Sequence, residues 1–124
     1  MIIVQLAELL GAEQVSADAD TLAAHRFDRW CLKHWQDWQG DVLDGPACVV
    51  RPRDSADVQS VVRFAADNNV SIVPWGLGSG VCGGVDPRPN QILIDMSAMD
   101  QVLSIDEENL LLTVEAGING LIAE

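Results

Sequence analysis

Apolar residues near the start of the chain are spaced as in helices. Residues 3–10 form an apolar run that predicts a short helix ending at Gly11. Residues 17–26 have a weaker helical pattern, with Asp18 or Asp20 near its start, where an aspartate favours a helix N-terminus. The first part of the chain is therefore expected to contain two short helices.

Residues 47–73 have the pattern of a strand, a helix and a second strand. The apolar run 47–51 before Pro52 is typical of a buried strand, and a second β-branched run covers residues 70–73. Asp54 is the expected N-cap of a helix between them. Its apolar side chains recur at i, i+3, i+4 and i+7: Val58, Val61, Val62 and Ala65. Such a βαβ unit predicts neighbouring parallel strands joined by a right-handed crossover.

The last third of the chain has mostly strand patterns. Apolar residues 92–95 predict a third strand, and residues 102–105 and 110–115 predict a strand pair around the acidic turn 106–109. A helix is expected to begin within residues 118–124. Together these elements predict an α+β fold, in which a small parallel βαβ sheet with flanking helices is followed by the start of a second strand layer.

The formal net charge of −12 excludes partners that need a basic face, so we expect neither nucleic acid nor a membrane to bind. No stretch reaches the ~18 apolar residues of a transmembrane helix. The three cysteines have neither metal-site spacing nor a CxxC pair, which is typical of a reducing compartment. Because the apolar N-terminal segment lacks a basic region, we expect a helix there, not a signal peptide, and a cytoplasmic protein.

Histidine and aspartate residues in the N-terminal part of the chain do not have the spacing of a metal site. We therefore expect no metal there, and a solvated surface for four of them: His25, Asp28, His34 and Asp37. Asp95 ends a predicted strand, where it contacts either a ribose or a neighbouring backbone group. The sequence does not decide between these two contacts.

Three of the four tryptophans lie within residues 27–40, a stretch that has neither the helical nor the strand period. They are Trp30, Trp35 and Trp38. We expect them to pack an N-terminal arm onto its own domain. An aromatic surface for a substrate or partner is the alternative.

The richest candidate for chemistry is the segment 74–84, Pro-Trp-Gly-Leu-Gly-Ser-Gly-Val-Cys-Gly-Gly. Glycine has no Cβ to hold a ligand away from the backbone, and it permits a positive φ. Consecutive backbone N–H groups can then converge on an anion, and Ser79 adds a hydroxyl donor. Phosphate binding without a lysine is therefore physically reasonable in this loop.

Two common nucleotide-binding motifs do not fit these glycines in their sequence context. A Walker A loop needs a Gly-Lys-Ser/Thr ending, which this segment lacks. Residues 78–83 match the Rossmann pattern GxGxxG, but that motif opens a helix, and residues 84–89 read Gly-Val-Asp-Pro-Arg-Pro. A glycine-rich loop without a ligand stays open on the glycines alone.

Four sequence blocks favour a ligand-binding loop over a glycine-rich loop without a ligand. They are Pro-Ala-Cys-Val-Val-Arg-Pro-Arg-Asp-Ser-Ala-Asp-Val at 46–58, Ile-Val-Pro-Trp-Gly-Leu-Gly-Ser-Gly-Val-Cys-Gly-Gly at 72–84, Ile-Leu-Ile-Asp-Met-Ser-Ala-Met at 92–99 and Val-Glu-Ala-Gly-Ile-Asn-Gly at 114–120. In these blocks the sequence closely resembles the FAD-binding domain of the FAD-linked oxidases, the vanillyl-alcohol-oxidase or PCMH-type flavoproteins. Within that family it looks most like bacterial relatives of alkylglycerone-phosphate synthase and of D-lactate, glycolate and 2-hydroxyglutarate dehydrogenases.

The resemblance implies that FAD is the cofactor and that backbone amides of the loop after the second strand hold its pyrophosphate. Carried across, the binding residues are Pro74, Trp75, Gly76, Leu77, Gly78, Ser79, Gly80 and Val81, with Gly83 and Gly84 supporting. Leu77 departs from the family pattern, which usually has glycine there, so weaker flavin binding is expected. Members with covalent flavin use a histidine in this loop, so non-covalent FAD is expected here. Cys82 is expected to be a packed thiol, with a contact to the flavin as the alternative.

The resemblance also implies a parent enzyme that oxidises a small 2-hydroxy acid by hydride transfer to flavin N5. A flavoenzyme like alkylglycerone-phosphate synthase is an alternative, and so is a non-catalytic fragment that binds no flavin by itself. The family's substrate and catalytic residues lie beyond residue 124, so no residue here is expected to be catalytic.

The expected domain organisation follows from where the resemblance is close. It covers residues 46–124 well, as a PCMH-type FAD-binding first subdomain, and residues 1–45 only loosely, as an N-terminal helical arm. Because residues 118–124 carry no stop signal for a helix, we expect the FAD-binding domain to be truncated at its C-terminus. The expected partners are the missing C-terminal FAD and substrate domains, with a small-molecule substrate in the full-length protein. Homodimer formation stays open.

Overall fold

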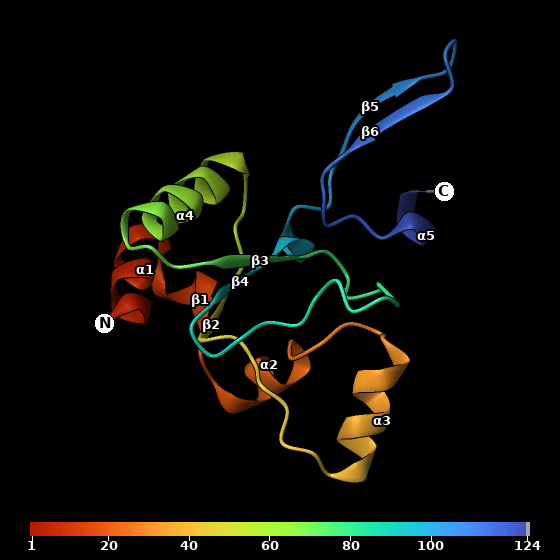
Figure 1. Cartoon of the computed structure of the whole chain (residues 1–124). Helices are drawn as coiled ribbons and strands as arrows, with labels where there is room; N and C mark the ends of the chain where they lie inside the picture. Colours follow the sequence, from red (N-terminus) through yellow and green to blue (C-terminus); the bar gives the residue numbers. More distant parts are fainter. Residues whose placement is uncertain (124) are drawn as a thin grey trace.

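The computed structural model describes residues 1–123 and contains two sheets with helices between and around their strands (Figure 1). The elements in chain order are α1 (Ile2–Leu10), the 3₁₀ helix η1 (Ala12–Gln14), β1 (Val15–Ser16), α2 (Ala19–Ala24), α3 (Cys31–Gln39), β2 (Cys48–Val50), α4 (Ser55–Asp67), β3 (Ile72–Trp75), β4 (Ile92–Asp95), the 3₁₀ helix η2 (Met96–Ala98), β5 (Val102–Asp106), β6 (Leu111–Val114) and α5 (Gly120–Ala123).

The larger sheet is the centre of the fold. Its strands lie in the order β1-β2-β4-β3, with β2, β4 and β3 parallel and β1 antiparallel to β2. The predicted βαβ unit is present, but the prediction that its strands are neighbours is wrong, because β4 lies between them. All four residues of β4 are buried, which suits a strand that has a partner on each side.

Alternating residues of β2 and β4 face opposite sides of this sheet. On one side they pack against α1 and α4, and α2 lies on the other side (Figure 1). Val49 and Leu93 face that second side and are fully buried. The cluster under α1 and α4 consists of Leu6, Leu10, Cys48, Val50, Val61, Ala65, Ile92 and Ile94. Because α1 and β1 join this core and this sheet, the N-terminal residues help to fix the strands that carry the loop.

The predicted helix starts have their expected caps. The Asp54 carboxylate accepts hydrogen bonds from the backbone N–H groups of Ala56 and Asp57 at 2.8 and 2.9 Å, and α4 begins there. Helix α3 was not predicted. It has no buried residue, and its apolar residues Cys31, Trp35 and Trp38, spaced at i, i+4 and i+7, form an exposed stripe and not a core-facing one.

The second sheet is the predicted antiparallel pair β5–β6, which projects away from the larger sheet (Figure 1). It exposes large apolar side chains, among them Ile105 at 69% and Leu111 at 61%. Across residues 1–123 no helix is both long and apolar enough to cross a bilayer.

Candidate functional site

The glycine loop, residues 76–84, begins where β3 ends. Pro74 and Trp75 form the carboxyl end of β3, and the chain turns from there into the loop (Figure 1). The carboxyl ends of the parallel strands β2 and β4 lie at the same edge of the sheet. Ligands of open α/β sheets usually bind outside this edge, so the fold places the loop where a ligand site is expected.

The backbone N–H groups of the glycine loop are free to bind a ligand. Within residues 1–123 none of the nine N–H groups of residues 76–84 donates a hydrogen bond to a protein acceptor. The loop contains only bends, with no hydrogen-bonded turn, and most of it is exposed. Backbone donors are nearly always paired in folded proteins, with water or a ligand where no protein group serves. This row of donors is suited to an anion with several oxygens.

Two glycines have backbone conformations that other residues rarely adopt. Gly78 has φ +61° and Gly83 has φ +76°. The backbone at Gly78 lies against the Trp75 indole, where a Cβ would be 2.3 Å from a ring carbon. At Gly83 a Cβ would be 2.6 Å from the Trp30 ring. The Trp75 and Trp30 rings therefore pack directly against the loop backbone at Gly78 and Gly83, which leaves room only for glycine at both positions.

A buried polar cluster lies beneath Trp75 at the carboxyl edge of the sheet. The Asp95 carboxylate is 3.3 Å from Nε2 of His25, and it accepts hydrogen bonds from Nε of Arg51 at 2.8 Å and from the Ser97 backbone N–H at 3.0 Å. The His25 ring packs on the Trp75 ring with centroids 4.8 Å apart. Of the two contacts left open for Asp95, the structure contains the one to a backbone group, and a ribose contact stays a prediction.

This cluster shifts the pKa of both buried partners. The hydrogen bond to Asp95 raises the pKa of His25 above 6.5, and the Thr21 carbonyl 2.7 Å from Nδ1 acts in the same direction. Burial alone raises the pKa of Asp95, but the hydrogen bonds from His25, Ser97 and Arg51 outweigh burial and hold it below its usual range. His25 is thus favoured as an imidazolium paired with a carboxylate.

We expect the free energy of unfolding to fall as the pH rises through the raised pKa of His25. The pKa of a histidine in the unfolded chain is about 6.5, and the folded chain keeps the His25 proton to a higher pH. The stability that this proton provides, about 1.4 kcal/mol for each unit by which the two pKa values differ, is therefore lost as the pH rises. Urea unfolding between pH 5.5 and 9 measures this slope. His25→Gln should flatten it; an unchanged slope in His25→Gln would contradict the assignment.

Asp28 also holds the glycine loop, although no pattern in the sequence indicates this. Its carboxylate is 2% exposed and accepts hydrogen bonds from the backbone N–H groups of Trp30 and Val85 at 3.0 and 3.3 Å. The neighbouring Arg29 N–H donates to the Gly80 carbonyl at 2.8 Å. The prediction of a solvated surface is therefore wrong for Asp28, and also for His25, which is 7% exposed. His34 and Asp37 are exposed as predicted, and residues 1–123 hold no group of metal ligands.

The tryptophan prediction is right for one residue and wrong for two. Trp30 is half-buried and packs on the loop, but Trp35 and Trp38 are 54% and 80% exposed on α3. Cys82 is exposed, so the prediction of a packed thiol is wrong. It lies on the outer part of the loop, away from the core that would pack it.

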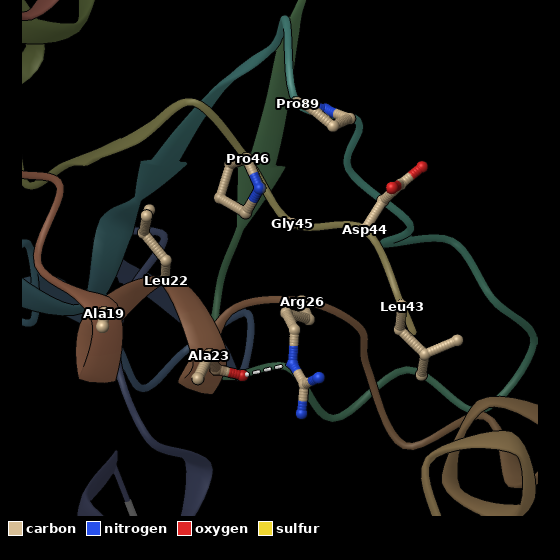
Figure 2. A pocket seen from close by; sticks show the side chains of 9 residues that line it. All are labelled: Ala19, Leu22, Ala23, Arg26, Leu43, Asp44, Gly45, Pro46 and Pro89. Carbon is tan, nitrogen blue, oxygen red and sulfur yellow. Dashed lines mark hydrogen bonds between the residues drawn. The ribbon is translucent and has the colours of Figure 1, made fainter. Parts of the chain in front are cut away.

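A cavity of about 440 Å³ lies apart from the glycine loop (Figure 2). Figure 2 shows that its walls come from α2, from the segment before β2 and from Pro89. The lining is mostly apolar, with the Arg26 guanidinium and the Asp44 carboxylate as its charges. Arg26 Nε donates to the Ala23 carbonyl at 3.2 Å, so this guanidinium is already engaged. The cavity has no residue in common with segment 74–84.

Positive charge near the glycine loop is scarce. Five cations lie within 4.0 Å of an aspartate: Arg26, Lys33, Arg51, Arg53 and Arg88. Among residues 1–123, Arg29 and Arg63 have no such partner. Of these two residues, Arg29 is the one whose backbone is bonded to the loop, at the Gly80 carbonyl.

Comparisons with known proteins point to one family. The family model described as "FAD binding domain" matches residues 46–123. Alkyldihydroxyacetonephosphate synthase of Trypanosoma brucei brucei is 31% identical over 121 residues, which are 94% of this chain and 20% of the synthase. Glycolate oxidase subunit GlcD of Bacillus subtilis (strain 168) is 36% identical over 73 residues, which are 59% of this chain and 16% of that subunit. The chain thus spans a fifth or less of these relatives.

Solved structures share the fold over nearly the whole chain. A structure of alkyldihydroxyacetonephosphate synthase has a TM-score of 0.88 and 26% identity, and covers 99% of this chain and 23% of its own. A structure of p-cresol methylhydroxylase with substrate bound has a TM-score of 0.75 and 20% identity, with 95% and 22% covered. The second likeness concerns the fold alone. Together they confirm the predicted α+β fold of the PCMH type.

Proposed function

The chain belongs to the family of FAD binding domains found in FAD-linked oxidoreductases, and we propose that its glycine loop binds the pyrophosphate of FAD. The observation that carries this proposal is the row of nine backbone N–H groups without a protein acceptor. A pyrophosphate has enough oxygens to accept from several of them at once. The loop also lies at the carboxyl edge of the parallel strands.

The residues of the loop fit such a ligand. Glycine at 78 and 80 lets the loop backbone lie close to the Trp75 ring and the Asp28 carboxylate, and the exposed Ser79 hydroxyl adds a donor. The ligand is anionic and the chain has a net charge of −12, so backbone dipoles replace side-chain charge as the main attraction. No histidine lies within residues 74–84, which supports non-covalent attachment.

The function of the bound cofactor is proposed from the relatives. When bound, the flavin ring supplies a hydride acceptor, and we propose a small 2-hydroxy acid as the donor. A glycolate oxidase subunit among the relatives supports this substrate class, whereas alkyldihydroxyacetonephosphate synthase supports the alternative chemistry. This chain's own residues bind and orient the cofactor and hold no reacting group.

The exposed hairpin β5–β6 supports a further part of the proposal. Large apolar side chains on its strands are 44–69% exposed, which is more than a free two-stranded sheet usually tolerates. We propose that the remaining FAD and substrate domains of a longer flavoenzyme cover this hairpin. FAD would then lie between two parts of the protein, and this chain alone would bind it more weakly.

FAD added to the 124-residue chain should shift the backbone amide resonances of residues 76–84 more than those elsewhere. The physical reason is that these N–H groups form the bonds to the pyrophosphate. A ¹H–¹⁵N correlation spectrum recorded up to about 1 mM FAD detects even weak binding. Inorganic pyrophosphate is the matched probe for the phosphate part and should shift the same amides.

Two outcomes would contradict the proposal. Shifts confined to the cavity around Arg26 would place the ligand elsewhere. A spectrum that does not respond to FAD or to pyrophosphate at millimolar concentration would favour the chain as a fragment that binds no flavin by itself. Unchanged shifts with riboflavin, which has no pyrophosphate, are the expected negative control.

A further inference from the structure

The segment from His25 to Trp30 lies outside the residues matched by the family model, yet it contacts the glycine loop along its length. His25 packs on Trp75 before the loop, and Trp30 packs on Gly83 near the end of the loop. Between them, Asp28 is also buried. Its carboxylate is 2.8 Å from the position that a Cβ on Gly80 would occupy.

Asp28 and Arg29 form hydrogen bonds to two residues of the loop region, Gly80 and Val85. The backbone N–H of Arg29 donates to the Gly80 carbonyl at 2.8 Å, and the N–H of Asp28 donates to the Val85 carbonyl at 3.3 Å. The Asp28 carboxylate also accepts from the Val85 N–H at 3.3 Å. Residues 80 and 85, on either side of residues 81–84, are therefore held by bonds from a segment more than 50 residues away.

A structural role in the core would not require a carboxylate at this position. Asp28 is 2% exposed and has no cation within 4.0 Å among residues 1–123, so only backbone N–H groups compensate for its burial. A buried charge of this kind costs stability compared with a well-packed apolar side chain. Its contacts lie with the loop and with its own turn, which indicates a role in the shape of the loop.

We propose that Asp28 is a positioning residue that holds residues 80–85 in the conformation that binds pyrophosphate. This inference rests on the proposed function. It extends the phosphate site to a second element of the chain, the segment 28–30, and assigns that segment no contact with the reacting part of any ligand.

The test compares Asp28→Ala and Asp28→Asn in the 124-residue chain, with Asp37→Asn on α3 as the control. Without ligand, Asp28→Ala should move the amide resonances of Gly80, Gly83 and Val85 and speed their hydrogen exchange, while β2 and β4 stay unchanged. With FAD, its dissociation constant should rise about tenfold. Asparagine keeps one carbonyl acceptor and about the same shape, so it should restore part of both effects.

Each result supports or overturns the proposal. Loop resonances and FAD affinity that stay at wild-type values in Asp28→Ala overturn it. If alanine prevents folding, Asp28→Asn decides: a change confined to residues 80–85 supports the role, and an unchanged loop overturns it. If the wild-type chain does not bind FAD, the proposed function is contradicted but the role of Asp28 is not. The comparison without ligand still tests whether Asp28 determines the conformation of the loop.

Discussion

Gly78→Val is expected to lower the affinity for FAD by about 100-fold or more, which corresponds to about 3 kcal/mol. Gly78 has φ +61°, and a β-branched residue there is strained by about 1–3 kcal/mol. Its Cβ would also be 2.3 Å from the Trp75 ring, so either the indole or the loop must move. Both effects act directly on the loop that carries the row of free N–H groups.

Spectroscopic titration with FAD measures this loss, and two glycine variants separate its causes. Gly40→Val places the same strain, at φ +86°, at the end of α3 away from the loop. Gly120→Ala adds a side chain at the start of α5, outside the loop, where no atom lies within 4 Å. Both should keep most of the affinity. Wild-type affinity in Gly78→Val would mean that the pyrophosphate lies elsewhere.

The position of the loop could be predicted because it depends on local sequence. The β-branched run before it, the glycines within it and the proline-rich exit all lie within about 20 residues, and they placed the loop after a parallel strand. The ends of α1, α4 and β4 were also close to their predicted places, because Gly11, Asp54 and Asp95 are local signals.

The order of the strands could not be predicted, because it is a tertiary property. A βαβ pattern gives the direction of its strands but leaves room for a third strand between them. The burial of β4 on both faces, with Ile92 and Ile94 under α1 and α4 and Leu93 on the other face, suits the central position that it takes. Helix α3 was missed for the opposite reason. Its local signal was present, since Cys31, Trp35 and Trp38 stand at i, i+4 and i+7, but it was not recognised as a helix face, and the structure leaves that face exposed.

The supports of the site were missed for the same kind of reason as the strand order. Asp28 and His25 are polar residues in an irregular stretch, where a solvated surface is the usual expectation. Their partners, Val85 and Asp95, lie 57 and 70 residues further on. Spacing along the chain carries no signal of such pairs, so the structure was needed to find them.

Asp95→Ala is expected to lower the free energy of unfolding by about 3 kcal/mol near pH 6, because it leaves a buried His25 without its acceptor. Arg51 is 41% exposed and can turn to water, but His25 cannot. The pKa of His25 should fall, since the hydrogen bond to Asp95 is the main cause of its rise. Urea unfolding measures the first effect, and histidine ring resonances during a pH titration measure the second.

Loss of the Asp95 carboxylate should affect the glycine loop as well as the free energy of unfolding. Asp95 pairs in register with Trp75, whose ring packs on both His25 and Gly78, so loss of the carboxylate should also weaken FAD binding. Asp44→Ala removes an exposed aspartate 3.5 Å from Arg88 and should change stability by no more than about 0.5 kcal/mol. A stability change as small as that of Asp44→Ala, together with an unchanged pKa of His25, would contradict this prediction. The cluster of Asp95, His25 and Arg51 would then not stabilise the carboxyl edge of the sheet.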